Sequence, residues 1–182
     1  MKSLLSVAVC IWFVVNVFGQ GTITWNPPTA PITTNGLGGN GPISGAGNYR
    51  FGLYAGPVGS SAGSLMLVGL TTNGNIAGSY IGQSHTVPPP IGSGTIALQV
   101  RGWSAFAGLT YESALSYALA ETSPIAFLGQ STIDTYTFGG PLPYRPAAFE
   151  LTPVPEPTTF ALAMVGAGAL AVGIRSRRKR LH

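Results

Sequence analysis

Residues Thr95–Ser104, with the sequence TIALQVRGWS, form the clearest strand pattern in the chain. A β-strand places successive side chains on opposite faces of its sheet, so alternate residues belong together. One set is aliphatic and the other is mixed: Ile96, Leu98 and Val100 on one face, and Ala97, Gln99, Arg101 and Trp103 on the other. The stretch therefore predicts a β-strand.

Shorter stretches before and after this one also favour strands. They are Gln20–Asn26, Tyr49–Ala55, Leu65–Leu70, Ile125–Leu128, Thr132–Phe138 and Ala148–Thr152. Leu65–Leu70 is apolar on both faces, which is typical of a central strand. Asn73-Gly74 is a favoured type I′ turn pair, so we expect Ile76–Ile81 to return as a hairpin partner.

Three other segments have different patterns. Thr29–Asn48 is rich in Gly, Asn and Pro and is predicted to be a long loop. Pro88-Pro89-Pro90 is a stiff connector. Between Thr110 and Ala120 the apolar residues follow a helical period, with Thr110 as the N-cap. We expect this helix to cover an edge or end of the sheet. The sum is a mainly β fold, a single jelly-roll-like β-sandwich with one short helix.

The first 19 residues have the pattern of a secretory signal peptide. Lys2 supplies the positive charge, Leu4–Phe18 is apolar, and cleavage is expected between Gly19 and Gln20. A retained membrane anchor is the alternative, and Val9 before Cys10 argues against a lipoprotein signal. The globular domain is then residues 20–153. Cys10 is the sole cysteine and leaves with the signal peptide, so the domain has no disulfide.

Residues 154–182 have three consecutive parts. Pro155, Glu156 and Pro157 come first, and a predicted transmembrane helix at about 158–174 follows. The basic cluster of residues 175–182 is expected to stay on the cytoplasmic side: Arg175, Arg177, Arg178, Lys179 and Arg180. A helix packed in the protein core is the alternative, but the stretch lacks the polar stripe of such a helix.

The net charge of +4 comes from the termini, which hold Lys2 and the five basic residues of the tail. Between residues 20 and 153 there are three basic and four acidic residues, so the net charge is −1: Arg50, Arg101 and Arg145 against Glu112, Glu121, Asp134 and Glu150. The high pI therefore indicates membrane retention and gives no reason to expect nucleic acid as a partner.

The order of parts in residues 154–182 resembles the PEP-CTERM sorting signal of bacterial envelope proteins. This resemblance implies processing by the membrane protease-transpeptidase exosortase near Pro155-Glu156-Pro157. The expected partners are thus the Sec export machinery, exosortase and, at least transiently, membrane lipid. The precursor would be anchored in the inner membrane, and the product would reach the cell surface or extracellular matrix. YRFGLYAGPVGS and LQVRGWSAFAGLTYESA also resemble an exported domain type, without established activity, that precedes such tails.

No constellation in the sequence predicts catalysis, a cofactor or a metal site. The literal G-x-G-x-x-G at residues 36–41 lacks a following helix and a nearby acid. The G-x-S-x-G at residues 59–63 precedes an apparent strand, and the sole histidine of the domain, His85, comes before every acid. A pair of carboxylates for glycoside hydrolysis is the remaining enzymatic alternative, to be tested by whether the four acids converge.

Carbohydrate binding is the stronger alternative to a purely structural role. Trp103 is expected to share a face with Arg101 and Gln99, which is a combination that could bind a sugar. The competing interpretation is that the aromatic residues fill the core. We therefore expect a non-enzymatic surface or matrix protein, with a module for extracellular polysaccharide as the alternative.

Overall fold

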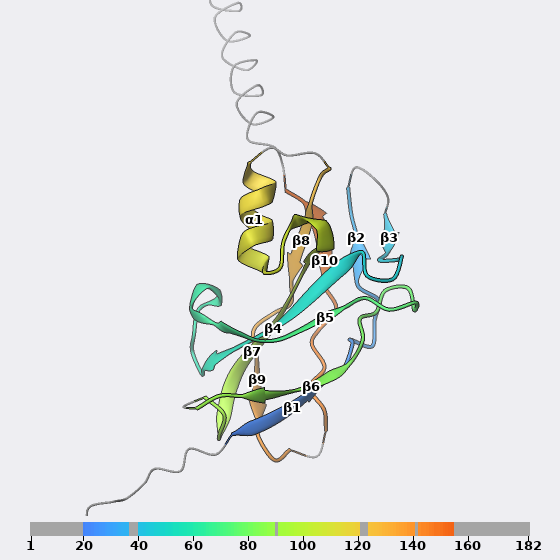
Figure 1. The fold of residues 1–182 in the computed structure, drawn as a ribbon. Coiled ribbons are helices and arrows are strands. Elements are labelled where there is room, and N and C mark those ends of the chain that lie inside the picture. The colour runs from blue at the N-terminus through green and yellow to red at the C-terminus, as the bar shows by residue number, and fades with distance from the viewer. Residues whose placement is uncertain (1–19, 37–39, 90, 121–123, 141, 155–182) are drawn as a thin grey trace, which may run out of the picture.

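The computed structural model describes residues 20–36, 40–89, 91–120, 124–140 and 142–154 of the 182-residue chain (Figure 1). The predicted signal peptide up to Gly19, the sorting residues Pro155, Glu156 and Pro157, the transmembrane stretch and the basic cluster lie outside the described residues. Among the helices that are described, none combines the length and hydropathy needed to cross a membrane.

The described strands form two sheets of unequal size. The large mixed sheet has the order β3 (Gly41–Pro42), β2 (Thr33–Thr34), β10 (Glu150–Pro153), β8 (Phe127–Gln130), β7 (Thr95–Ser104), β4 (Tyr49–Pro57) and β5 (Met66–Thr72), with β9 (Asp134–Thr137) also paired to β7. Its pairs are antiparallel except for the parallel pair β10–β2. The small sheet is the antiparallel pair of β1 (Gly21–Trp25) and β6 (Gln83–Val87).

Strand β7 is the centre of the large sheet. One of its edges pairs with all nine residues of β4. The other edge pairs with β9 near the start of β7 and with β8 near its end. Ser131 fills the gap between these two partners, because its hydroxyl accepts from the Val100 N–H and its N–H donates to the Val100 carbonyl.

The alternation predicted for β7 is confirmed, and both of its faces are buried. Ile96, Leu98 and Val100 join a core that also contains Ile23 and Trp25 of the small sheet. The two sheets therefore share one hydrophobic core. On the opposite face of β7, Trp103 belongs to a second cluster, which includes Ala114 and Ala118 of α1 (Tyr111–Leu119).

The N-cap of the helix is also confirmed. The Thr110 hydroxyl accepts from the Ser113 N–H, and the Ser113 hydroxyl accepts from the Thr110 N–H. The helix packs on β7 and β8 through small residues, since Ala114 and Ala118 are buried while Leu115 and Leu119 are 38% and 53% exposed. The predicted apolar stripe is thus only partly used for packing. A 3₁₀ turn, η2 (Ala105–Ala107), precedes the helix, and another, η1 (Ala62–Ser64), precedes β5.

Several expectations need correction. Strand β5 lies at an edge of the large sheet, where Met66 and Leu67 are exposed, so it is not a central strand. The expected Asn73-Gly74 hairpin is replaced by a wider loop, in which Asn73 pairs with Tyr80 in a single bridge. The expected long loop contains β2 and β3, and β6 was not expected. The mainly β architecture with one short helix is confirmed, whereas the jelly-roll-like sandwich stays a prediction.

Candidate functional site

The three residues of the predicted glycan face are buried. The exposed fractions are 0% for Trp103, 5% for Arg101 and 2% for Gln99. The Trp103 indole N–H donates to the Gly108 carbonyl at 3.0 Å, and its ring meets the Tyr111 ring edge-on. These side chains therefore do not form a solvent-facing surface for a sugar, which corrects the prediction and agrees with the alternative that the aromatics fill the core.

Arg101 is instead the centre of a buried polar network. Its Nη1 donates to Glu112 Oε1 at 2.9 Å, and its Nε donates to Gln99 Oε1 at 3.0 Å. Its Nη2 donates to the Ala62 carbonyl. The Gln99 amide extends the network, because its Nε2 donates to the Ser131 carbonyl at 3.0 Å. A buried guanidinium with its donors engaged in this way is stabilised in place.

Tyr54 completes the network from β4. The Arg101 guanidinium carbon lies 3.9 Å from the centre of the Tyr54 ring, a cation–π geometry. The Tyr54 hydroxyl donates to Glu112 Oε2 at 3.1 Å. Burial, followed by the Glu112 charge, raises the pKa of Tyr54 to about 12. The sequence carries one signal of this arrangement: Arg101 lies in a strand that is otherwise nearly apolar, and a buried arginine needs an acid, of which Glu112 is the nearest in sequence.

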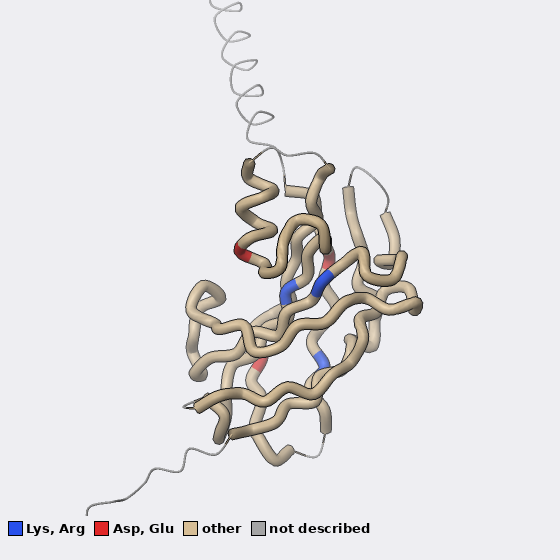
Figure 2. Tube along the Cα trace, in the orientation of Figure 1, with Lys and Arg blue, Asp and Glu red and all other residues tan. Residues whose placement is uncertain are grey.

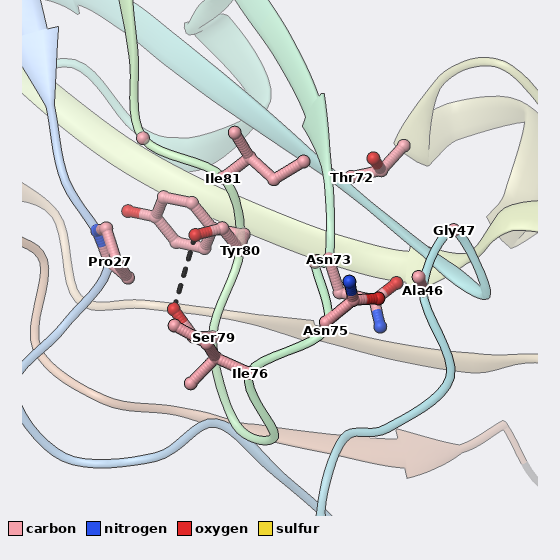
Figure 3. Close-up of a pocket in the computed structure, with 12 residues that line it drawn as sticks. Pro27, Ala46, Gly47, Thr72, Asn73, Asn75, Ile76, Ser79, Tyr80 and Ile81 are labelled. Atoms are coloured by element: carbon pink, nitrogen blue, oxygen red, sulfur yellow. Dashed lines mark hydrogen bonds between the residues drawn. The ribbon is translucent and has the colours of Figure 1, made fainter.

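A cavity of about 760 Å³ lies at the wide loop between β5 and β6 (Figure 3). Pro27 and Tyr80 line one side, and Asn73, Asn75 and Gly47 lie across from them. The full lining is Pro27, Ala46, Gly47, Thr72, Asn73, Gly74, Asn75, Ile76, Ser79, Tyr80, Ile81 and Gly82. This lining carries no charged side chain, so the cavity suits a neutral ligand.

Two buried residues give this cavity a fixed wall. Asn73 is 1% exposed; its Oδ1 accepts from the Tyr49 N–H at 2.9 Å, and its Nδ2 donates to the Gly45 carbonyl at 2.8 Å. The Tyr80 hydroxyl donates to the Asn26 carbonyl at 2.7 Å, and burial raises the pKa of Tyr80. The polar groups of Asn73 and the Tyr80 hydroxyl are therefore engaged within the fold.

The described carboxylates belong to separate elements (Figure 2). Glu112 is on α1, Asp134 on β9 and Glu150 on β10, while Glu121 lies outside the described residues. Asp134 accepts hydrogen bonds from the hydroxyls of Thr132, at 3.1 Å, and Tyr144, at 3.2 Å. Among the residues that the structure describes, no group of three His, Cys, Asp or Glu side chains could hold a metal ion.

The C-terminal end of the described domain is held firmly. Thr152 and Pro153 of β10 pair with Leu128 and Phe127 of β8, and the Val154 N–H donates to the Ala126 carbonyl at 3.4 Å. Val154 also packs against the cluster around Trp103. The last described residue is thus still in contact with the fold, directly before Pro155.

This arrangement defines a small, mainly β domain whose last described strand, β10, ends at Pro153. Residues 153–179 match the family model of the PEP-CTERM protein-sorting motif. The chain therefore carries this motif at its C-terminus, and the motif implies an exported, membrane- or surface-associated protein that is sorted and processed by exosortase. No curated protein and no solved structure matches the chain.

Proposed function

We propose that this chain is a non-enzymatic component of the cell surface or extracellular matrix. In this proposal the signal peptide of residues 1–19 directs export through the Sec machinery. A transmembrane helix at about 158–174 then holds the precursor with its C-terminus in the cytoplasm, and exosortase acts at Pro155, Glu156 and Pro157. The two sheets form the exported sandwich domain.

The match of residues 153–179 to the sorting motif carries this proposal. It begins at Pro153, the last residue of β10, so the sorting signal follows the folded domain immediately. Two of the three described carboxylates are engaged in hydrogen bonds within the fold, which supports a structural role for the domain. Glu112 is bound by Arg101 and Tyr54, and Asp134 accepts from Thr132 and Tyr144.

The test is a deletion of residues 155–182 that leaves Val154 in place, since Val154 contacts the core. We expect the truncated protein to be released in soluble form into the periplasm or medium. Deletion of residues 175–182 alone is the matched control for the basic cluster, and mass spectrometry of the native C-terminus locates processing. Unchanged localisation after the longer deletion would contradict the sorting role.

A carbohydrate-binding module is the second candidate, and the cavity at the wide loop favours it. The cavity is neutral, and Asn75, Ile76 and Ile81 at its border are exposed. Amides and apolar side chains together match the hydroxyls and apolar faces of a sugar. A glycan array on the exported protein tests this: binding that Ile81→Ala abolishes supports it. An array without binding, or binding that Ile81→Ala leaves intact, removes the cavity as the glycan site.

A further inference from the structure

We propose that the end of the domain around the C-terminus of α1 rests on the membrane lipid surface in the anchored precursor. The contact surface, which we call the α1 patch, consists of Phe106, Leu115, Leu119 and Ile125. The inference rests on the proposed function in one respect, because it requires the stretch at about 158–174 to span the membrane. Beyond the proposed function, the inference identifies the face of the domain that contacts the lipid and the apolar chemistry of that contact.

Phe106, Leu119 and Ile125 are linked to the point where the described chain ends through the cluster around Trp103, against which both Tyr117 and Val154 pack. Phe106 packs edge-on against Tyr117 of α1, with ring centres 5.7 Å apart. Leu119 is the last residue of α1 and follows Ala118, which belongs to the same cluster as Ala126. Val154 packs against this cluster. Ile125 directly precedes Ala126, whose carbonyl accepts from the Val154 N–H.

The short connection after Val154 keeps this end of the domain close to the membrane. Three residues, 155–157, separate Val154 from the start of the apolar stretch at Thr158. The Cα atoms of Val154 and Thr158 are therefore at most about 15 Å apart. The headgroup layer on each side of a bilayer is itself roughly 5–8 Å thick. A folded domain tied this closely to a membrane span has its nearest side chains within reach of the headgroup region.

The chemistry of the patch suits lipid. Phe106 is 52% exposed, Leu119 is 53%, Leu115 is 38% and Ile125 is 37%. The helix is uncharged from Ser113 onward, and its one charge, Glu112, is at the opposite end and bound to Arg101. The four described residues of the patch carry no charge, so their contact with the interface would bury apolar surface; the nearest acid in sequence, Glu121, lies outside the described residues. Tyr117, beside Phe106, belongs to a residue type that is enriched at membrane interfaces.

The opposite end of the molecule differs in character. The small sheet of β1 and β6 lies at the far end of the domain from α1 (Figure 1). Its exposed positions are hydroxyl-bearing residues, including Thr22, Thr24, Ser84 and Thr86. This end provides a control surface, with exposed polar side chains in place of apolar ones.

The test uses the full chain in vesicles of phosphatidylethanolamine and phosphatidylglycerol. Three variants are made in a Cys10→Ser background, each with a single cysteine that carries an environment-sensitive fluorophore. The cysteine replaces Leu119 in the patch, Thr86 in the small sheet, or Ala163 as a reporter of the tail. Spin-labelled lipid and an aqueous quencher then report the location of each label. We expect lipid quenching at positions 119 and 163 and aqueous quenching at position 86. High salt should not release the patch, because its contact is apolar.

The outcomes separate this inference from the proposed function. A lipid-embedded label at position 163 with an aqueous label at position 119 overturns the inference and leaves the membrane span standing. An aqueous label at position 163 overturns the span and the inference together. A second variant avoids labelling Leu119: Leu119→Glu should abolish lipid quenching of a label at Phe106→Cys, whereas Leu142→Glu, at a site that is 74% exposed, should not. Equal quenching in both variants overturns the inference.

Discussion

The Arg101 guanidinium lies over the Tyr54 ring, 3.9 Å from its centre, and both side chains bind the same carboxylate, that of Glu112. The three residues come from β7, β4 and α1, so this triangle joins the helix to the two longest strands of the large sheet. The burial of its members differs. The Arg101 side chain is 6% exposed, whereas that of Glu112 is 61% exposed, so the positive charge depends on its partner more than the negative one does.

Removal of Glu112 should therefore lower the free energy of unfolding by more than the loss of an ordinary surface ion pair would. Glu112→Ala leaves a buried guanidinium without its counter-charge, and we expect the free energy of unfolding to fall by about 2 kcal/mol. An exposed pair would contribute about 0–1 kcal/mol. The pKa of Tyr54 should fall from about 12, because Glu112 is one of the causes that raise it. Urea unfolding and phenolate absorbance measure the two effects.

A double-mutant cycle with Arg101→Met is the control. Methionine has similar length but no charge, so Glu112→Ala in this background should change the free energy of unfolding by less than about 0.5 kcal/mol. Equal costs of Glu112→Ala in both backgrounds would show that the carboxylate acts independently of the arginine.

Local pattern in the sequence was sufficient for features that depend on neighbouring residues. The two faces of β7 and the Thr110 cap follow from period and side-chain chemistry alone, and both are as expected. The position of β5 at a sheet edge was not predictable in this way. An apolar run has the same pattern in a central strand and in an edge strand, and the difference depends on which distant strands pair with it.

Asn73 shows the same limit at a single residue. Asn-Gly is a turn signal, but here the asparagine is buried and binds the Gly45–Tyr49 segment. Asn73→Ala leaves the Tyr49 N–H and the Gly45 carbonyl without their side-chain partner, so we expect a loss of about 3 kcal/mol in the free energy of unfolding. Asn75→Ala, at an exposed position of the same loop, should change it by less than about 0.5 kcal/mol. Similar effects of the two changes would contradict this assignment.

The site residues were predictable by type more than by role. The face shared by Gln99, Arg101 and Trp103 was expected from their spacing, and they do lie together. Their burial depends on α1 and on the η1 turn, which cover this face from distant parts of the sequence. The alternation of a strand predicts which residues share a face but not what packs against that face.

Gly129 is required where β8 meets β10. A Cβ at this position would contact the Glu150 carbonyl oxygen and lie 2.9 Å from Leu151 Cδ2. Because the obstacle includes backbone, Gly129→Ala should displace β10 and lower the free energy of unfolding by about 2 kcal/mol. The end of β10 should also become more accessible to proteases next to the sorting motif, as limited proteolysis can show.

Gly63→Ala is the control for this change. A Cβ at Gly63 would meet no heavy atom of the described residues within 4 Å, so the variant should match the native stability. If Gly129→Ala is as stable as Gly63→Ala, the close approach of β8 and β10 does not constrain the fold.

His85 should make the stability of the domain depend on pH. Its ring lies against Gly69, where an added Cβ would be 2.7 Å from Nε2, and its centre is 6.0 Å from that of Trp25. Nε2 is buried and has no hydrogen-bond partner among the described residues. Burial lowers the pKa of His85 below its usual value of 6.5, since the charged imidazolium loses its hydration.

The direction of the effect follows from proton binding. Between the lowered pKa of the folded state and 6.5, the unfolded chain binds more protons than the folded one, so the free energy of unfolding falls as the pH decreases through this range. Denaturant titrations between about pH 7.5 and pH 5 should show this decline in the native protein and lose it in His85→Gln. His182→Gln changes the other histidine, in the tail, and should retain the decline. In the described domain only His85 combines a titration near neutral pH with burial against Gly69 and Trp25, so its removal should remove the decline. A decline of equal size in His85→Gln would instead assign the pH dependence to other groups.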